Sequence, residues 1–213
     1  MDMIQEETLD AISFVGHTLA PFYLQDPVKG DAADMFEAMA QLDPHAAAQE
    51  WPFVGDEIAA DALSLMVDGL KDGIDDDLMW EYRRLFVGPN PKPAPPWGSV
   101  YTDKECVVFG ASTLSLRAWM RENGFARLSD EKTPEDHIGL MLELMAFIAE
   151  TRPEKLDEYL SLHVLTWSKH FLELLADSCE HSFYKGLALL TNASLEGIKD
   201  TLSLDVTYPR FYR

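Results

Sequence analysis

Apolar side chains recur three or four residues apart along almost the whole chain, which is the spacing of one face of an α-helix. The first such stretch has its apolar positions at Ile4, Leu9, Ile12, Val15, Leu19 and Phe22. Nowhere does the sequence alternate apolar and polar residues with the β-branched composition of a strand. The pattern therefore predicts an all-α fold, and the length of 213 residues predicts a single domain over residues 1–213.

Capping residues and helix breakers divide this pattern into separate helices. Helices are expected at 4–22, 32–41, 56–70, 75–86, 112–123, 153–162, 166–179 and 183–202. The aspartates at 75–77 are expected to begin a helix, because carboxylates are favoured at its positive N-terminal end. Gly88-Pro89 and Gly124 are expected to end helices. Thr133-Pro134 is typical of a helix start, so one more helix is expected there.

Acidic residues outnumber basic ones by 37 to 17, which gives a formal net charge of −20. Such a charge repels nucleic acid and anionic membranes and attracts cationic ligands. We therefore expect no nucleic-acid partner. The hydrophobic share of 47% indicates a folded chain despite this charge.

The N-terminal stretch and the two cysteines bear on the compartment. Residues 1–7 are acidic where a signal peptide would be basic, and no apolar run is long enough to span a membrane. Cys106 and Cys179 are far apart in sequence and fit no zinc-type spacing. The sequence predicts a cytoplasmic protein with no stable membrane insertion.

Residues 88–98 form an irregular segment with five prolines and one tryptophan, Trp97. Prolines at this density prevent a regular helix and favour an extended path. A flexible linker is one interpretation of the segment. A tryptophan followed at once by an aromatic-rich stretch favours the other, an ordered functional loop.

Motifs that carry catalytic chemistry are absent from the sequence. It has no glycine-rich phosphate loop, no serine-hydrolase elbow and no metal-ligand spacing among its six histidines. We therefore expect no enzyme activity, no cofactor and no metal. Asp136-His137 is the one polar pair of interest, either as an acid in the first turn of a helix beside a partly buried histidine, or as an acceptor and a switchable donor in a groove.

Several longer strings occur in the order seen in one family, the TorD/DmsD chaperones. They are Tyr82-Arg-Arg-Leu-Phe-Val-Gly-Pro89, Pro95-Pro-Trp-Gly-Ser-Val-Tyr101, Glu105-x-x-x-Phe-Gly110, Pro134-Glu-Asp-His-Ile-Gly139, Glu180-His181-x-Phe-Tyr184 and Pro209-Arg-Phe-Tyr-Arg213. The chain resembles this family from about Trp51 to its C-terminus. The first two strings resemble the DmsD branch in particular.

The resemblance implies an all-α bundle of about ten helices, with some members forming domain-swapped dimers. It implies a chaperone that binds the twin-arginine leader of a dimethyl sulfoxide reductase-type molybdoenzyme and assists its maturation before export. The twin-arginine translocase is a second partner to consider. Carried over by motif, the leader-binding residues are Tyr82, Leu85, Phe86, Pro96, Trp97, Asp136 and His137. Asn90 stands where the DmsD pattern has a tryptophan. We therefore expect this chain either to contact its leader less at position 90 or to prefer a different leader.

Two alternatives to leader binding stay open at this point. A chaperone of the same family could hold the mature part of a molybdoenzyme subunit, and an isolated leader would then not suffice for binding. A nucleotide-binding protein is the other alternative, although no phosphate loop supports it.

Overall fold

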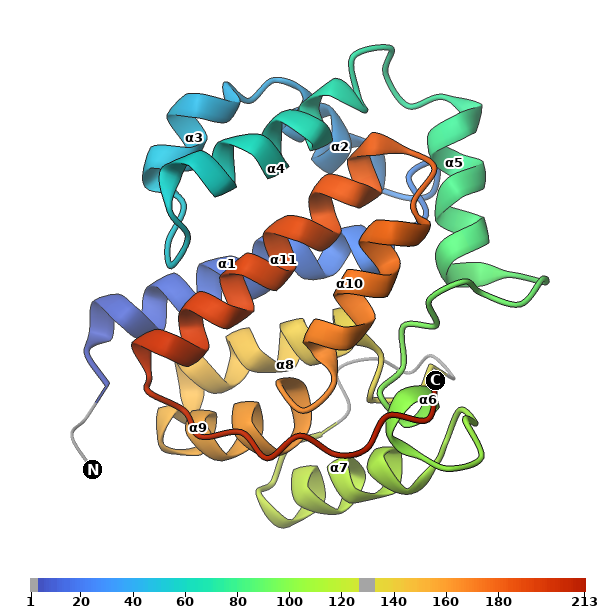
Figure 1. The fold of residues 1–213 in the computed structure, drawn as a ribbon. Helices are drawn as coiled ribbons and strands as arrows, with labels where there is room; N and C mark the ends of the chain where they lie inside the picture. Colours follow the sequence, from blue (N-terminus) through green and yellow to red (C-terminus); the bar gives the residue numbers. More distant parts are fainter. Residues whose placement is uncertain (1–3, 127–132) are drawn as a thin grey trace. The chain divides into compact units, whose positions relative to one another are not determined.

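A computed structural model describes residues 4–126 and 133–213, and in this part of the chain the fold is all-α, as expected (Figure 1). The α-helices are α1 Glu6–Leu24, α2 Ala32–Ala40, α3 Pro44–Glu50, α4 Asp56–Asp68, α5 Asp76–Tyr82, α6 Ser99–Thr102, α7 Ala111–Glu122, α8 Ile138–Thr151, α9 Leu156–Tyr159, α10 Ser168–Ser178 and α11 Ser182–Thr201. Two π-helical turns, η1 Arg83–Val87 and η3 Leu160–Val164, and one 3₁₀ turn, η2 Pro153–Lys155, complete the order. Among the described helices, none is both long and apolar enough to cross a bilayer.

Contacts between Cα atoms divide the chain into two compact units, each built from separate segments. Unit 1 contains residues 1–20, 96–169 and 202–213, and unit 2 contains residues 21–95 and 170–201. The proline-rich segment is thus divided between the units: residues 88–95 belong to unit 2 and residues 96–98 to unit 1. The single domain expected from the length stays a prediction, and each unit is described by itself.

In unit 2, helix α11 lies along α4 (Figure 1). Gly186 permits this approach, since a Cβ atom there would lie only 2.4 Å from the carbonyl O of Ala62. Three phenylalanines fill the interior, with ring centroids 5.0–5.2 Å apart: Phe22, Phe36 and Phe183. Burial of these large apolar rings stabilises the unit.

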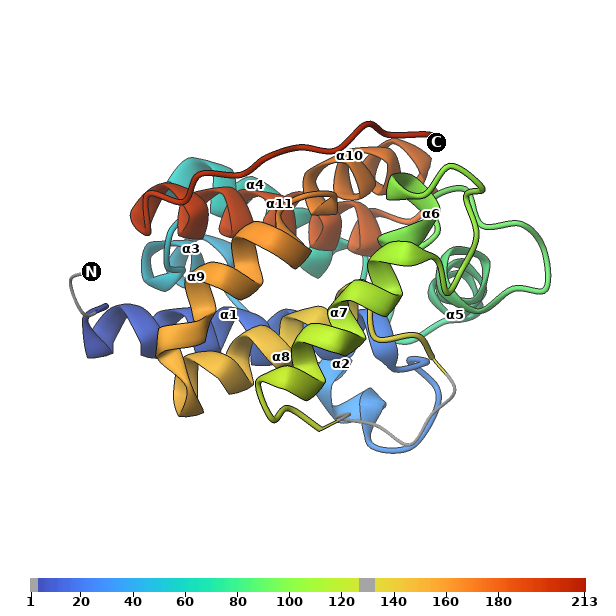
Figure 2. The same cartoon turned by 90° about the horizontal axis from the view of Figure 1, so that it is seen from below.

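In unit 1, α8 and α9 lie side by side (Figures 1 and 2). Helix α8 is buried along most of its length, and the hydroxyl of Tyr159 on α9 donates to the carbonyl O of Met141 at 2.9 Å. The C-terminal segment runs back to α6, where the N–H of Tyr212 donates to the carbonyl O of Tyr101 (Figure 2). Tyr101 in turn stacks on Trp167, with ring centroids 6.0 Å apart.

Most of the predicted helices are present within a few residues of their expected ends, but several details differ. Helix α1 continues through Pro21 to Leu24, two residues beyond its expected end. Helix α3 was not predicted, because among its residues only Ala48 is buried and its seven residues carry no apolar stripe. Its start is a capping turn, in which the Asp43 carboxylate accepts the N–H groups of His45 and Ala46.

The predicted helix start at Thr133 is wrong, since α8 begins at Ile138. The preceding residues form a turn in which the N–H of His137 donates to the carbonyl O of Pro134 at 3.1 Å. The N–H of Ile138 donates to the carbonyl O of Pro96 at 2.9 Å. Backbone pairing with the proline-rich segment therefore replaces the expected first helical turn, and tertiary contacts outweigh the local capping signal.

Candidate functional site

A short backbone pairing in unit 1 joins the end of the proline-rich segment to the turn before α8. Trp97 and His137 form an isolated antiparallel bridge, and the N–H of Gly98 donates to the carbonyl O of Asp136 at 3.2 Å. The indole of Trp97 and the imidazole of His137 meet edge to face, with ring centroids 5.5 Å apart. The pairing brings together four of the predicted site residues, Pro96, Trp97, Asp136 and His137.

The carboxylate of Asp136 is buried with limited compensation for its charge. Its Oδ2 accepts the N–H of Ser99 at 2.8 Å, and its residue is only 3% exposed. Within the described part of the chain, its Oδ1 has no hydrogen bond of normal geometry. Burial raises the pKa of Asp136 above its usual value, and the nearby groups of Ser99 and Thr113 only partly oppose this. A cation or a strong donor near Oδ1 would stabilise the charged form.

His137 has a structural role that the sequence did not specify. Its Nδ1 accepts the N–H of Gly139 at 3.2 Å, so the imidazole caps the N-terminus of α8. The residue is 4% exposed. Asp136 is not in the first turn of the helix, which corrects that interpretation, because it precedes the capping residue.

A small cavity of about 60 Å³ lies beside Asp136 within unit 1. Its polar lining includes Ser112, His163 and Thr166, and Trp167 closes part of its wall. Burial lowers the pKa of His163 to about 4, so its imidazole is neutral at pH 7. The cavity has room for a few water molecules or one small polar group but not for a peptide.

The other three predicted residues lie in unit 2 and form one aromatic cluster. Tyr82, Leu85 and Phe86 are 4%, 0% and 6% exposed. The Phe86 ring packs against Tyr82 and Tyr184, with centroids 5.4 and 5.8 Å away. These side chains are therefore largely interior. They are drawn from a different unit than Trp97 and Asp136, and a single binding surface made from all seven residues stays a prediction.

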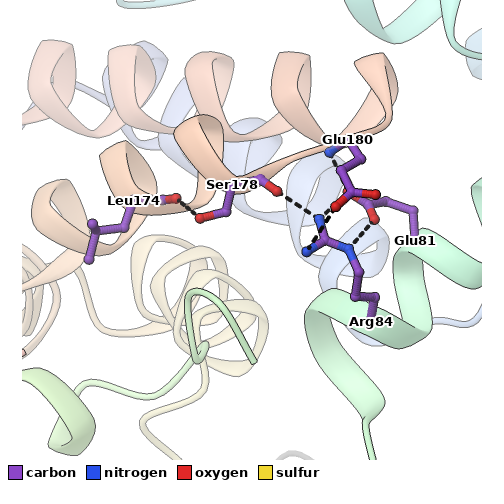
Figure 3. A network of polar contacts seen from close by, with 5 residues as sticks. All are labelled: Glu81, Arg84, Leu174, Ser178 and Glu180. Carbon is purple, nitrogen blue, oxygen red and sulfur yellow. Dashed lines mark hydrogen bonds and ion pairs between the residues drawn. The ribbon is translucent and has the colours of Figure 1, made fainter. Parts of the chain in front are cut away.

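A second buried carboxylate in unit 2 was not singled out by the sequence (Figure 3). Glu81 receives two hydrogen bonds from the Arg84 guanidinium, at 2.6 and 2.9 Å, and a third from the N–H of Glu180 at 2.7 Å. Arg84 also donates to the carbonyl O of Ser178 at 2.7 Å, and the Ser178 hydroxyl donates to the carbonyl O of Leu174. The network fixes η1 against the turn between α10 and α11.

These bonds set the protonation of the network. Burial alone would raise the pKa of Glu81, but the Arg84 guanidinium and the backbone N–H of Glu180 hold it below its usual value. The pKa of Arg84 is raised by the same pairing. Arg84 and Glu180 each lie in one of the strings that resemble the family. Their presence in these strings was the one feature of the sequence that could have indicated this network.

Comparison with known proteins identifies the family of the chain. Residues 55–176 match the family described as the nitrate reductase delta subunit. The DmsD protein of Haemophilus influenzae is 38% identical over 98% of this chain and 100% of its own length. The chain therefore belongs to this family, and its resemblance to the TorD/DmsD chaperones is confirmed.

Further relatives extend the comparison. The Tat proofreading chaperone DmsD of Salmonella typhi is 34% identical over 96% of this chain and 97% of its own. The chaperone TorD of Aliivibrio fischeri is 21% identical over 70% of this chain and 74% of its own. The crystal structure of a redox enzyme maturation protein from Archaeoglobus fulgidus shares the fold, with a TM-score of 0.52, 21% identity and coverage of 92% of this chain and 98% of that one. The likeness thus extends N-terminal to Trp51, where the motifs alone showed little.

Proposed function

We propose that this chain is a chaperone that binds the twin-arginine leader of a dimethyl sulfoxide reductase-type molybdoenzyme in the cytoplasm and assists its maturation before export. The DmsD relatives at 34–38% identity support this role, because their names describe Tat proofreading. The observation that carries the proposal is the pairing of Trp97 with His137, which sets an aromatic side chain beside the buried carboxylate of Asp136.

Electrostatics favours a cationic ligand for this chain. The net charge of −20 attracts a leader with two adjacent arginines, and this attraction weakens with salt. At close range, Asp136 is the acceptor we propose for one guanidinium, since its Oδ1 is the under-compensated end of a buried carboxylate. Because Asp136 is 3% exposed, contact requires local opening around the cavity beside it.

The apolar part of the leader requires an aromatic anchor. Trp97 is only partly buried, and its backbone is held by the pairing on one side and by prolines on the other. A side chain fixed in this way loses little conformational entropy on binding. We therefore propose Trp97 as the anchor, with Pro96 holding its backbone.

Calorimetric titration with a synthetic twin-arginine leader tests the proposal. Binding is expected to weaken when both arginines are replaced by lysine, because lysine lacks the bidentate fork, and to weaken again at higher salt. Trp97→Ala is expected to weaken binding by about 30-fold, roughly 2 kcal/mol. Leu114→Ala is the control, because Leu114 lies in the same unit and is 58% exposed.

Two results would count against the proposal. Unchanged affinity in a folded Trp97→Ala variant would remove Trp97 from the binding residues. Absence of binding to any isolated leader would overturn leader recognition itself, and the mature part of a reductase subunit would become the ligand to test.

A further inference from the structure

Residues 202–213, here called the tail, lie on unit 1 as an extended segment that runs back to α6 (Figure 2). Residues 204–213 are neither helical nor paired in a strand, and every residue of the tail is half-buried or exposed. Its first half-buried residues alternate with exposed ones, as in an extended chain with one side on the protein: Leu202, Leu204 and Val206. A segment without a buried side chain opens at a low cost in free energy, so the tail can leave the surface while the rest of unit 1 stays folded.

The tail is attached to α6 close to its end. The N–H of Tyr212 donates to the carbonyl O of Tyr101 at 2.9 Å. The guanidinium of Arg210 lies over the Tyr212 ring, 5.3 Å from its centroid, and helps to hold that ring in position. Tyr101 is 0% exposed, so the hydrogen bond joins the weakly held tail to a residue of the interior.

Tyr101 belongs to the wall of the cavity beside Asp136. Its ring stacks on Trp167, with ring centroids 6.0 Å apart and an angle of 12° between the planes. Gly98, immediately before α6, also lies against Trp167, since a Cβ atom there would lie 2.7 Å from the indole Nε1. Gly98, Thr102 and Trp167 all line the cavity. Helix α6 and Trp167 therefore form one packed wall, and the tail is bonded to this wall at Tyr101.

Helix α6 also holds the carboxylate that the proposed function assigns to an arginine. The N–H of Ser99 donates to Oδ2 of Asp136 at 2.8 Å. Asp136 is 3% exposed, so the opening that admits a guanidinium has to move part of the cavity wall, to which α6 contributes. A bond that keeps α6 in place opposes this opening, and leader affinity is reduced in proportion to the fraction of molecules that are open.

We infer that the tail is a releasable strap, which holds α6 closed beside Asp136 through its bond to Tyr101 and whose release admits the arginine of the leader. The inference rests on the proposed function and adds the regulation of that same site. It keeps the leader at Trp97 and Asp136 and gives the tail no contact with it. Docking of the tail and binding of the leader then oppose each other, because a leader that binds the open form must loosen the tail to the same extent as the tail weakens the leader.

Titration of a synthetic twin-arginine leader into tail variants gives the first test. Tyr212→Pro removes the N–H that bonds to Tyr101 and is expected to raise leader affinity about fivefold, because more of the molecules are open. Tyr212→Ala is the matched control, since it removes the same ring but keeps the N–H, and it is expected to change affinity less than twofold. A chain shortened after Tyr208 lacks the attachment altogether and is expected to bind the leader at least as tightly as Tyr212→Pro does.

Hydrogen exchange of backbone amides tests the strap without a leader. In Tyr212→Pro, the amides of Ser99 and Thr102 should exchange about tenfold faster than in the wild type, because α6 opens more often. The amides of α8 should exchange at the wild-type rate, which would show that the variant is folded. In the wild type, a saturating leader should speed the exchange of the Tyr212 amide, because the open form releases the tail.

The possible results separate the inference from the proposed function. If the wild type binds the leader and Tyr212→Pro binds it with the same affinity, the inference is overturned and leader binding stands. If the α6 amides exchange equally fast in the wild type and in Tyr212→Pro, the tail does not hold α6 and the inference is overturned as well. If neither the wild type nor Tyr212→Pro binds any leader, the proposed function fails and the regulatory role of the tail fails with it.

Discussion

Two buried carboxylates, one in each unit, are treated in opposite ways by their surroundings. Glu81 in unit 2 accepts three hydrogen bonds, two of them from the Arg84 guanidinium, and its pKa lies below the usual value. Asp136 in unit 1 accepts one backbone hydrogen bond of normal geometry from Ser99, and its pKa lies above the usual value. Both residues are at most 5% exposed, so burial alone does not separate them.

The difference separates a structural charge from one available to a ligand. A buried carboxylate with its partners in place stabilises the fold and has no capacity left for binding. A buried carboxylate with too few partners costs stability until a donor arrives, and such costs concentrate at functional sites. On this basis Glu81 maintains η1, whereas Asp136 is the better candidate for contact with an arginine.

The largest expected effect comes from removing the partner of Glu81. Arg84→Ala is expected to lower the free energy of unfolding by about 3 kcal/mol, because it leaves a buried charge without its counter-ion. Arg152→Ala is the control: Arg152 and Glu154 form an exposed pair, so its loss should cost less than about 1 kcal/mol. Urea unfolding of both variants gives the comparison, and equal losses would show that the Glu81 network is not special.

A smaller effect of opposite sign is expected at Asp136. Asp136→Asn should raise the free energy of unfolding at pH 7 by about 1 kcal/mol, since it removes a poorly compensated buried charge. The same substitution should weaken leader binding about tenfold through loss of the charge-assisted bond to a guanidinium. Glu81→Gln, in contrast, should lose stability. If Asp136→Asn lowers the free energy of unfolding instead, the Asp136 carboxylate stabilises the fold, as the Glu81 carboxylate does, and its role is structural.

The pH dependence of unfolding should differ in sign between the two carboxylates. The pKa of Glu81 is lowered in the folded state, so its contribution is present above the unfolded value of about 4.3 and is lost as pH falls through the folded pKa. The pKa of Asp136 is raised, so stability is lost as pH rises from about 3.9 through the folded pKa. The free energy of unfolding is measured from pH 3 to 8 for the wild type, Glu81→Gln and Asp136→Asn. The difference between the wild type and each variant gives the pH-dependent contribution of that carboxylate. If the two contributions change with pH in the same direction, the contrast between Glu81 and Asp136 is refuted.

The smallest effect is a change in thiol reactivity beside the Glu81 network. Burial raises the pKa of Cys179 to about 12, and the charge of Glu81 adds to this. In a Cys106→Ser background, labelling of the remaining thiol at pH 8 should therefore be slow, since the thiolate is the reactive form. Loss of Arg84 should loosen the network and increase the rate several-fold. An unchanged rate would mean that the turn between α10 and α11 stays closed without Arg84.

The sequence was sufficient for the all-α class and for most helix limits, because both depend on local periodicity. The sequence-based prediction failed where contacts between distant residues determine the start of a helix. At Thr133 the local capping pattern predicted a helix start, but the hydrogen bond from the N–H of Ile138 to the carbonyl O of Pro96 replaces the first helical turn. Helix α3 has too little apolar surface to be recognised by its period. The π-helical turns η1 and η3 leave no periodic signal of their own.

For the candidate site, the motifs indicated which residues matter but not how they are exposed. Trp80 and Leu85 belong to one predicted helix, 75–86, and only the fold reveals that Trp80 faces solvent and Leu85 does not. Likewise, the motif gave Asp136 and His137 as a pair, whereas His137 caps α8 and the Asp136 carboxylate receives the Ser99 N–H. Hydrogen-bond partners distant in sequence cannot be deduced from spacing.

The interleaved segments of the two units also have a consequence for how the chain is made. The face of α4 at Ala62 and Met66 is covered by Gly186 on α11, about 120 residues later in the chain. At the usual pace of about 5–20 residues per second, a ribosome needs roughly 6–24 s to synthesise the intervening stretch. During that interval the face of α4 that packs on α11 has no native cover, although α2 and α3 are already made and contact other parts of the helix. We therefore expect the nascent chain to expose this apolar face, the kind of surface that general holding chaperones bind, until α11 has been synthesised.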